Sequence, residues 1–298
     1  MGKVPRTVLL ATDGSPEMAG AFRAAAFLAR EAGAAVHLVH VWPYPSWPVS
    51  MMPVPQAYFD AMAGAGRFLL TIGTRMIAEF GGTVAATHLL PGRPATEIAA
   101  LAVQLQADLL LLGQHRHGRF RRYVALGVAG ALLREAPCPL LLFGSASSNP
   151  PTRIVIVDTA SSSAAAAARL AVGLAELADV RVHRLRLDSD RGLVGTGGNP
   201  SGDAGSTTTV AQMILAAASD LPTLLVLGET SLWTVAQVLH DAGGPVLICP
   251  SQAAASHSTR PPDGPRRGLR HWNRWSAVRQ YRGLSTLGNP ALVTNIGP

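Results

Sequence analysis

The chain has 298 residues, of which 48% are hydrophobic and 14% are charged, and its formal net charge at pH 7 is +7. This is the composition of a globular protein with room for two domains, and it excludes a disordered chain. Two cysteines exclude a disulfide framework and a set of cysteine zinc ligands, and no apolar run approaches the ~18 residues of a membrane helix.

The positive charge is concentrated in the C-terminal part of the chain. From residue 251 onward, seven arginines face Asp263 alone, which accounts for +6 of the net charge and leaves the rest of the chain nearly neutral. The N-terminal stretch MGKVPRTVLLATDGSP reaches an acidic turn too early for a signal peptide, and Arg6 stands where a myristoylation motif requires Ser or Thr. We therefore expect a cytoplasmic protein without a transmembrane segment.

Apolar strands and helices alternate along the first half. Residues 7–12 predict a strand, Asp13 and Gly14 predict a turn, and Ser15 predicts the N-cap of a helix that ends near Gly33. The predicted elements that follow are strand 35–42, helix 57–79, strand 83–90, a turn and helix within 91–106, strand 107–113, helix 131–136 and strand 139–143. This alternation predicts an α/β fold in which a parallel sheet carries helices on both faces.

The pattern restarts after residues 144–152, GSASSNPPT, which have the composition of a linker. The segment RIVIVDTASSSAAAAARLAVGLAELA repeats the strand, aspartate, polar cap and alanine-rich helix, and it places Asp158 where Asp13 stands. The segments VRVHRLRL, PTLLVLG and GPVLIC match VHLVHVW, ADLLLLG and CPLLLF. A Gly/Ser-rich stretch over about 188–206 replaces the second helix and third strand. We interpret this as an internal repeat, and predict domains over 1–145 and 152–251 before a basic, disordered tail over 252–298.

The segments TVLLATDGSPEMAGAFRAAAFLA, PGRPATEIAALAVQLQADLLLLG and LLREAPCPLLLF resemble the universal stress protein family. The two copies are similar to its tandem members, the second copy being truncated and degenerate. The resemblance implies two doubly wound, Rossmann-like sheets with strand order 3-2-1-4-5. It also implies a homodimer or an intramolecular domain pair formed through edge strands, and a role in stress survival without catalysis.

Members of this family that bind ATP resemble one another in a loop after the fourth strand, Gly-x-x-Gly, nine residues, then Gly-Ser or Gly-Thr. Glycines let backbone N–H groups approach the phosphates, and the last pair opens a helix whose N-terminus favours anions. Here Gly113 matches the first glycine, Arg116 stands at the second, and Leu126 and Gly127 stand at the final pair. A second register keeps three glycines with altered spacing and puts Val128 at the hydroxyl position. Both registers lack the hydroxyl.

The part of the motif that meets adenosine is better kept. The resemblance implies that Thr12 and Asp13 contact the adenosine, that Val41 packs on the base, and that Leu112 and Gly113 form the other wall. The alternative for Asp13 is to cap the turn into the first helix. ATP is thus the one cofactor that the resemblance implies.

Several other groups invite a chemical interpretation. Four arginines in the loop are interpreted as a solvated basic loop, with a phosphate clamp as the alternative; they are Arg116, Arg119, Arg121 and Arg122. His115 and His117 lack the further ligands of a metal site. Ala11 stands where a phosphatase of the Asp-x-Asp-Gly-Thr type has its nucleophile, so an enzyme is not expected. Glu229, near the start of a second-copy helix, would repel phosphate, so we interpret that copy as structural.

The leading hypothesis is a non-catalytic stress-response protein with weakened or absent ATP binding in the first domain and an unknown protein partner. One alternative is an adenine-nucleotide sensor that uses Asp13, Val41 and the loop from Gly113 to Gly127. A third hypothesis, the least favoured, is nucleic-acid binding through the arginine-rich tail, where Trp272, Trp275 and Tyr281 alternate with arginines.

Overall fold

The structure, a computed structural model, describes residues 2–15, 18–42, 55–113, 127–144, 150–158, 161–186, 222–228, 238, 244–250 and 253. The chain divides into two compact units, residues 1–259 and residues 260–298, and every described residue belongs to the first unit. The predictions for the Gly/Ser-rich stretch and the arginine-rich tail fall outside the described residues. No helix among the described residues combines the length and the hydropathy that a membrane span requires.

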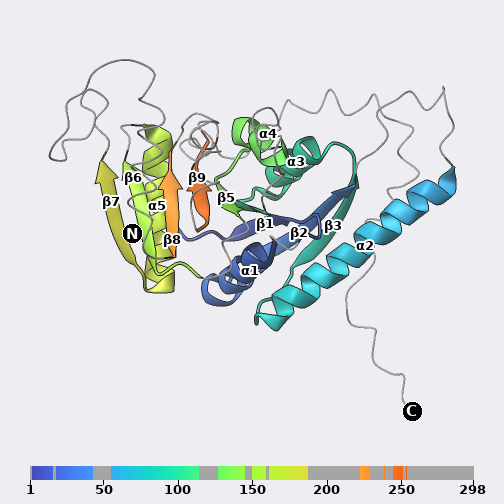
Figure 1. The fold of residues 1–298 in the computed structure, drawn as a ribbon, viewed down its shortest axis with the longest axis horizontal. Helices are drawn as coiled ribbons and strands as arrows, with labels where there is room; N and C mark the ends of the chain where they lie inside the picture. The colour runs from blue at the N-terminus through green and yellow to red at the C-terminus, as the bar shows by residue number, and fades with distance from the viewer. Residues whose placement is uncertain are drawn as a thin grey trace, which may run out of the picture. The chain divides into compact units, whose positions relative to one another are not determined.

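The described strands form one sheet in the order β3-β2-β1-β4-β5-β9-β8-β6-β7 (Figure 1). Their bounds are β1 Thr7–Ala11, β2 Ala35–Trp42, β3 Ala86–Pro91, β4 Leu109–Gly113, β5 Leu140–Phe143, β6 Arg153–Asp158, β7 Arg181–Arg186, β8 Thr223–Leu227 and β9 Val246–Ile248. Each neighbouring pair is parallel except β5 and β9, which run antiparallel with Leu141 opposite Leu247. The first half has the order 3-2-1-4-5, as predicted, and its fifth strand joins the two predicted sheets edge to edge.

Helices cover both faces of the sheet in the first half (Figure 1). The described helices are α1 Ala19–Ala32, α2 Gln56–Glu79, α3 Pro94–Leu105, α4 Gly127–Glu135 and α5 Ser162–Ala178. Side chains of α1 and α2, such as Phe22 and Ile77, share one core with alternate strand residues such as Leu38. Those of α3 and α4 share the second core with the strand residues that point the other way, such as Val39. The layered architecture therefore follows from the period of two along the strands.

Three predicted boundaries are wrong by three residues or more. The helix α1 begins at Ala19 rather than at Ser15, because Ser15 and Met18 close a turn in which the Met18 N–H donates to the Ser15 carbonyl at 3.1 Å. The strand β3 begins three residues after its predicted start at 83. Just before it the chain passes close to α1 at Gly82, where an added Cβ would lie 2.4 Å from the Ala26 Cα. The helix α4 begins at Gly127, four residues before its prediction at 131.

The two halves repeat the same strand register. Thr7 lies opposite Ala35 in the first half as Arg153 lies opposite Arg181 in the second, and Leu110 lies opposite Leu9 as Leu225 lies opposite Val155. Each preceding helix ends on a left-handed residue two positions before its strand, Gly33 for α1 and Asp179 for α5. Counterparts in the two halves are assigned from this register, which repeats the order 2-1-4-5 without a described third strand.

This register corrects one prediction about the repeat. Val157 is the counterpart of Ala11, so Asp158 is the counterpart of Thr12 rather than of Asp13. The sequence match was shifted by one residue because both strands end in a short polar run. The predicted polar cap of the second half is confirmed, since the Ser161 Oγ accepts from the Ala164 N–H at 3.1 Å.

The helix α2 packs closely on α1 and β2 because glycines line its inner face. A Cβ added to Gly73 would lie 2.9 Å from the Leu38 Cδ2 and 3.0 Å from the Phe22 Cε1, and a Cβ added to Gly66 would lie 2.5 Å from the Leu89 Cδ1. The absence of side chains at these positions lets the backbone of α2 approach the sheet.

Candidate functional site

The candidate site lies where β1 and β4 end side by side. The sheet order reverses between these two strands, and the carboxyl ends of parallel strands at such a point form the usual ligand crevice of doubly wound sheets. Ala11 lies opposite Leu112 in the ladder, so Thr12 and Gly113 emerge next to each other at this edge. The register thus brings two of the segments that the sequence analysis selected to one place.

A tight turn follows β1 and fixes the first two predicted residues. Thr12 is buried, its N–H donates to the Val39 carbonyl at 2.9 Å, and its Oγ1 accepts from the Gly14 N–H at 3.2 Å. The exposed Asp13 accepts from the Ser15 N–H through Oδ1 at 3.0 Å. Asp13 therefore makes the turn-capping bond that the alternative interpretation predicted, while its side chain remains open to solvent and to a ligand.

His40 supports this turn, and the sequence analysis missed it. Its Nδ1 lies 2.8 Å from the Thr12 carbonyl oxygen. A carbonyl only accepts, so Nδ1 carries the hydrogen of this bond. The only sequence signal was a second histidine near the carboxyl end of the mostly apolar strand that also holds His37.

The structure describes the residues that were predicted to form the walls of the site. Val41 and Leu112 are buried, with exposed fractions of 8% and 5%. Met18 lies directly behind Gly113, where an added Cβ would come within 2.5 Å of the Met18 Sδ. Any larger residue at 113 would displace Met18 or narrow the crevice. Met18 was also missed, because a methionine inside a helical pattern looks like an ordinary core residue.

Ser15 has a polar atom with no partner among the described residues. Its Oγ is buried from solvent and none of those residues lies within hydrogen-bonding distance of it. A buried hydroxyl without a partner costs about 1–3 kcal/mol unless another group satisfies it. This hydroxyl lies in the turn that links Asp13 to α1, beside the candidate crevice.

The other predicted end of the site is described only in part. Residues 114–126 lie outside the described residues, and with them Arg116, the other loop arginines, His115 and His117; the same holds for Glu229 in the second half. The helix α4 starts at Gly127, whose φ of +51° favours glycine, and an added Cβ there would meet no heavy atom within 4 Å. Val128 follows in the first turn and is 37% exposed.

Few other reactive groups gather in the described part of the chain. No three histidine, cysteine, aspartate or glutamate side chains there are placed to hold a metal ion. Cys138 and Cys249 are fully buried free thiols, and burial raises their pKa to about 12 and about 11, which makes them poor nucleophiles. His37 on β2 and His88 on β3 form a stacked pair with 3.1 Å between Nδ1 and Nε2.

Comparisons with known proteins match this fold. The model of the universal stress protein family matches residues 5–144. A universal stress protein of Methanocaldococcus jannaschii is 27% identical over 140 residues, which are 46% of this chain and 81% of that protein.

Two solved structures share the fold over most of the chain. A universal stress protein from Archaeoglobus fulgidus DSM 4304 has a TM-score of 0.62 at 15% identity, covering 83% of this chain and 97% of its own. A functionally unknown protein from Pseudomonas aeruginosa PAO1 has a TM-score of 0.53 at 16% identity, covering 85% and 95%. The family model thus identifies residues 5–144 as a universal stress protein domain.

Proposed function

We propose that the chain is a non-catalytic stress-response protein whose first half binds adenine nucleotides with little contribution from the phosphates. The observation that carries this proposal is the contrast between the two ends of the crevice. The end formed by β1, β2 and β4 is buried and preorganised, whereas the first turn of α4 has Val128 where ATP-binding relatives have a hydroxyl.

The adenosine end supports binding by its geometry. Thr12 and its turn are fixed by three hydrogen bonds, to Val39, Gly14 and His40, so little conformational freedom is lost when a ligand binds. Val41 gives an apolar wall and the exposed carboxylate of Asp13 gives an acceptor for a ribose hydroxyl or an amino group. A flat, mostly apolar ligand with a few polar edges suits such a site.

The phosphate end supports weak binding of the charged groups. Gly127 begins α4 in a left-handed conformation that leaves open space beside its backbone, and this favours the register in which Val128 takes the hydroxyl position. Valine offers no hydrogen bond to a phosphate oxygen. A hydrogen bond to a charged group contributes about 1.5–3 kcal/mol, so its loss weakens ATP binding about tenfold to a hundredfold.

Calorimetric titration of the purified full chain with adenosine, AMP, ADP and ATP tests this proposal. We expect similar affinities for all four ligands, a gain for ATP but not for adenosine in Val128→Ser, and a loss for every ligand in Asp13→Ala. A wild-type chain that binds ATP about a hundredfold more tightly than adenosine would contradict the weakened phosphate end. Absence of binding by all four ligands would contradict nucleotide binding altogether and leave a stress-response role that depends on a protein partner.

We further propose that the second half is a shortened universal stress protein copy that pairs with the first half within the chain. The repeated register and the antiparallel β5–β9 ladder support this proposal, since two copies related by a twofold axis join their last strands in antiparallel fashion. The copy would then take the place of a second subunit. Gel filtration with light scattering should give a monomer at micromolar concentration, and a stable dimer would contradict the internal pairing.

A further inference from the structure

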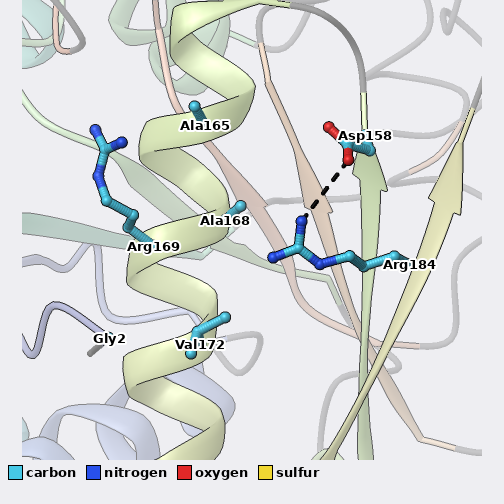
Figure 2. Close-up of a pocket in the computed structure, with 7 residues that line it drawn as sticks. All are labelled: Gly2, Asp158, Ala165, Ala168, Arg169, Val172 and Arg184. Atoms are coloured by element: carbon cyan, nitrogen blue, oxygen red, sulfur yellow. Dashed lines mark ion pairs between the residues drawn. The ribbon is translucent and has the colours of Figure 1, made fainter.

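A cavity of about 410 Å³ opens in the second half between α5 and the strands β6 and β7. Figure 2 shows Arg184 reaching from β7 towards Asp158 at the end of β6, with α5 alongside. The Arg184 Nη1 lies 3.7 Å from the Asp158 Oδ2, and more than half of the arginine side chain is exposed. The residues that line the cavity are Gly2, Asp158, Ala165, Ala168, Arg169, Val172 and Arg184.

Three of the lining residues are the counterparts of residues that α2 and the turn after it cover in the first half. By the shared register, Ala168, Val172 and Arg184 correspond to Phe22, Ala26 and Leu38. In the first half α2 and the turn after it pack on all three of these residues, through Gly73 and Gly82. Of the residues that the structure describes in the second half, none forms a helix in that place. The cavity is therefore the groove in which a helix lies in the first half.

The groove differs from its counterpart in size and in charge. Alanine replaces the ring of Phe22, so the floor is deeper, and arginine replaces the buried Leu38. A helix that filled this groove would need a long side chain above Ala168 and an acceptor for the guanidinium of Arg184. Asp158 supplies part of that acceptor at 3.7 Å, and guanidinium has five N–H donors in total, so donors remain for a second carboxylate.

One end of the groove is occupied by the N-terminus of the chain. A Cβ added to Gly2 would clash with the backbone of Gly173, and the Lys3 N–H donates to the Arg169 carbonyl at 3.0 Å. In the first half the corresponding place beside Ala26 is taken by Gly82, after the end of α2. The N-terminal segment thus closes the groove at the end where a packed helix would finish, and leaves the part lined by Ala168 and Arg184 open.

We propose that this groove binds an amphipathic helix of a partner protein, with a glutamate on its apolar face that pairs with Arg184. The internal comparison identifies the occupant as a helix, and the exchange of Leu38 for Arg184 requires the acidic group. The binding mode is the helix-in-groove mode, in which a few side chains on one helix face act as anchors. It is independent of nucleotide binding in the first half.

A peptide derived from α2 provides the probe. It spans residues 56–79, without the turn whose place the N-terminal segment occupies, and it carries Gly73→Glu, because Gly73 lies above Leu38 and Phe22 and would lie above Arg184 and Ala168 in the second half. The glutamate fills the space that the missing phenylalanine ring leaves and places a carboxylate at Arg184. Fluorescence anisotropy of the labelled peptide with the full chain should show saturable binding, at least about tenfold tighter than that of the unchanged peptide.

Two variants of the full chain install the residues of the first half. Ala168→Phe fills the groove. Arg184→Leu removes the charge from a side chain that is more than half exposed, so we expect this variant to fold like the wild type. Both should weaken binding of the glutamate peptide about tenfold or more while thermal unfolding remains cooperative. Equal binding to all three chains, or no binding of the glutamate peptide to the wild type, would overturn the proposal.

Thiol labelling shows whether the groove is open in the free protein. Ala168→Cys should react quickly with a maleimide, whereas Phe22→Cys should not, because α2 covers that position; the native cysteines are buried. Slow labelling of Ala168→Cys at every protein concentration would mean that another part of the chain fills the groove. Protection that develops only as the concentration rises, together with dimers in sedimentation, would mean that a second copy fills it. Either result overturns the proposal of a different partner.

Discussion

The layer of α1, β2 and α2 in the first half and the layer of α5 and β7 in the second half share one backbone plan and differ in their cover. In the first half Leu38 is fully buried beneath α2, and in the second half its counterpart Arg184 is exposed. Arg181 on β7 also replaces Ala35, which is exposed on the opposite face of β2. A strand can therefore keep its register without a covering helix when the residue that the helix would cover is charged.

The same exchange protects the open edge of the sheet. β7 is the last strand of the described sheet, with backbone groups that face no further strand there, and it carries arginines along its length. Charged side chains on an edge strand oppose edge-to-edge association with another chain. At the other end β3 is also an edge strand, and its partner β2 lies under α2.

The largest difference between the halves should appear in the free energy of unfolding when the residue beneath α2, or its counterpart on β7, is truncated to alanine. Leu38→Ala should lower the free energy of unfolding by about 2–5 kcal/mol, because it leaves a cavity between β2 and α2. Arg184→Ala should lower it by only about 0–1 kcal/mol, because an exposed ion pair contributes little. Urea unfolding of both variants measures the two values. Equal costs would mean that a helix covers Arg184 in the free protein.

The glycines of α2 allow a sharper test within a single helix. Gly73→Ala should lower the free energy of unfolding by about 1–3 kcal/mol, since its Cβ would lie 2.9 Å from Leu38 and 3.0 Å from Phe22. Gly64→Ala is the matched control, because an added Cβ there meets nothing within 4 Å, and it should stabilise α2 by about 0.5–1 kcal/mol. If both substitutions stabilise the protein, the inner face of α2 is not closely packed.

These contrasts show what could be predicted from the residues alone. The strand 35–42 was predicted with its observed bounds because AVHLVHVW is a β-branched, apolar run between turn residues. The order of the first five strands followed from the resemblance. The sequence analysis expected either a homodimer or an intramolecular domain pair, and it did not predict which strands would pair. Antiparallel pairing between distant segments leaves no periodic signal in either of them, so the pairing of β5 with β9 could not be predicted.

The candidate site was predictable where it depends on strand ends and unpredictable where it depends on packing. Thr12, Asp13 and Gly113 stand at positions that topology brings together. The roles of Met18 and His40 depend on how α1 and β2 lie against the turn, which no local pattern records. The shift of Asp158 by one residue has the same origin, since only the ladder register distinguishes two adjacent polar positions.

Acid should destabilise the first half through its histidine pair. Burial lowers the pKa of His37, and burial together with the charge of His37 lowers the pKa of His88, so the folded state binds fewer protons than the unfolded state below about pH 6.5. The free energy of unfolding should therefore fall as the pH drops from 7.5 to 5.5. In the double variant His37→Gln, His88→Gln this fall should be smaller.

Denaturant titrations of the wild type and of the double variant across this pH range measure the two dependences. An unchanged fall in the double variant would place the acid sensitivity outside the β2–β3 pair.

The smallest expected effect concerns the ion pair below β1, whose place in the second half is taken by a bond from an arginine to a hydroxyl. The Lys3 Nζ lies 2.9 Å from the Asp108 Oδ1, while the Arg153 Nε donates to the Thr223 Oγ1 at 2.8 Å at the corresponding place. Burial alone would raise the pKa of Asp108, but the bonds from Lys3 and from two backbone N–H groups lower it overall. Its contribution to stability is thus present above the usual carboxyl pKa and is lost as the pH falls through the lowered value.

Lys3→Met should accordingly cost about 0.2–1 kcal/mol at pH 7, because the lysine is half exposed and the backbone N–H groups of Arg6 and Thr7 still bind the carboxylate. The cost should shrink in high salt, which screens an exposed ion pair. If the cost of Lys3→Met does not depend on salt, the lysine side chain contributes through packing and not through its charge.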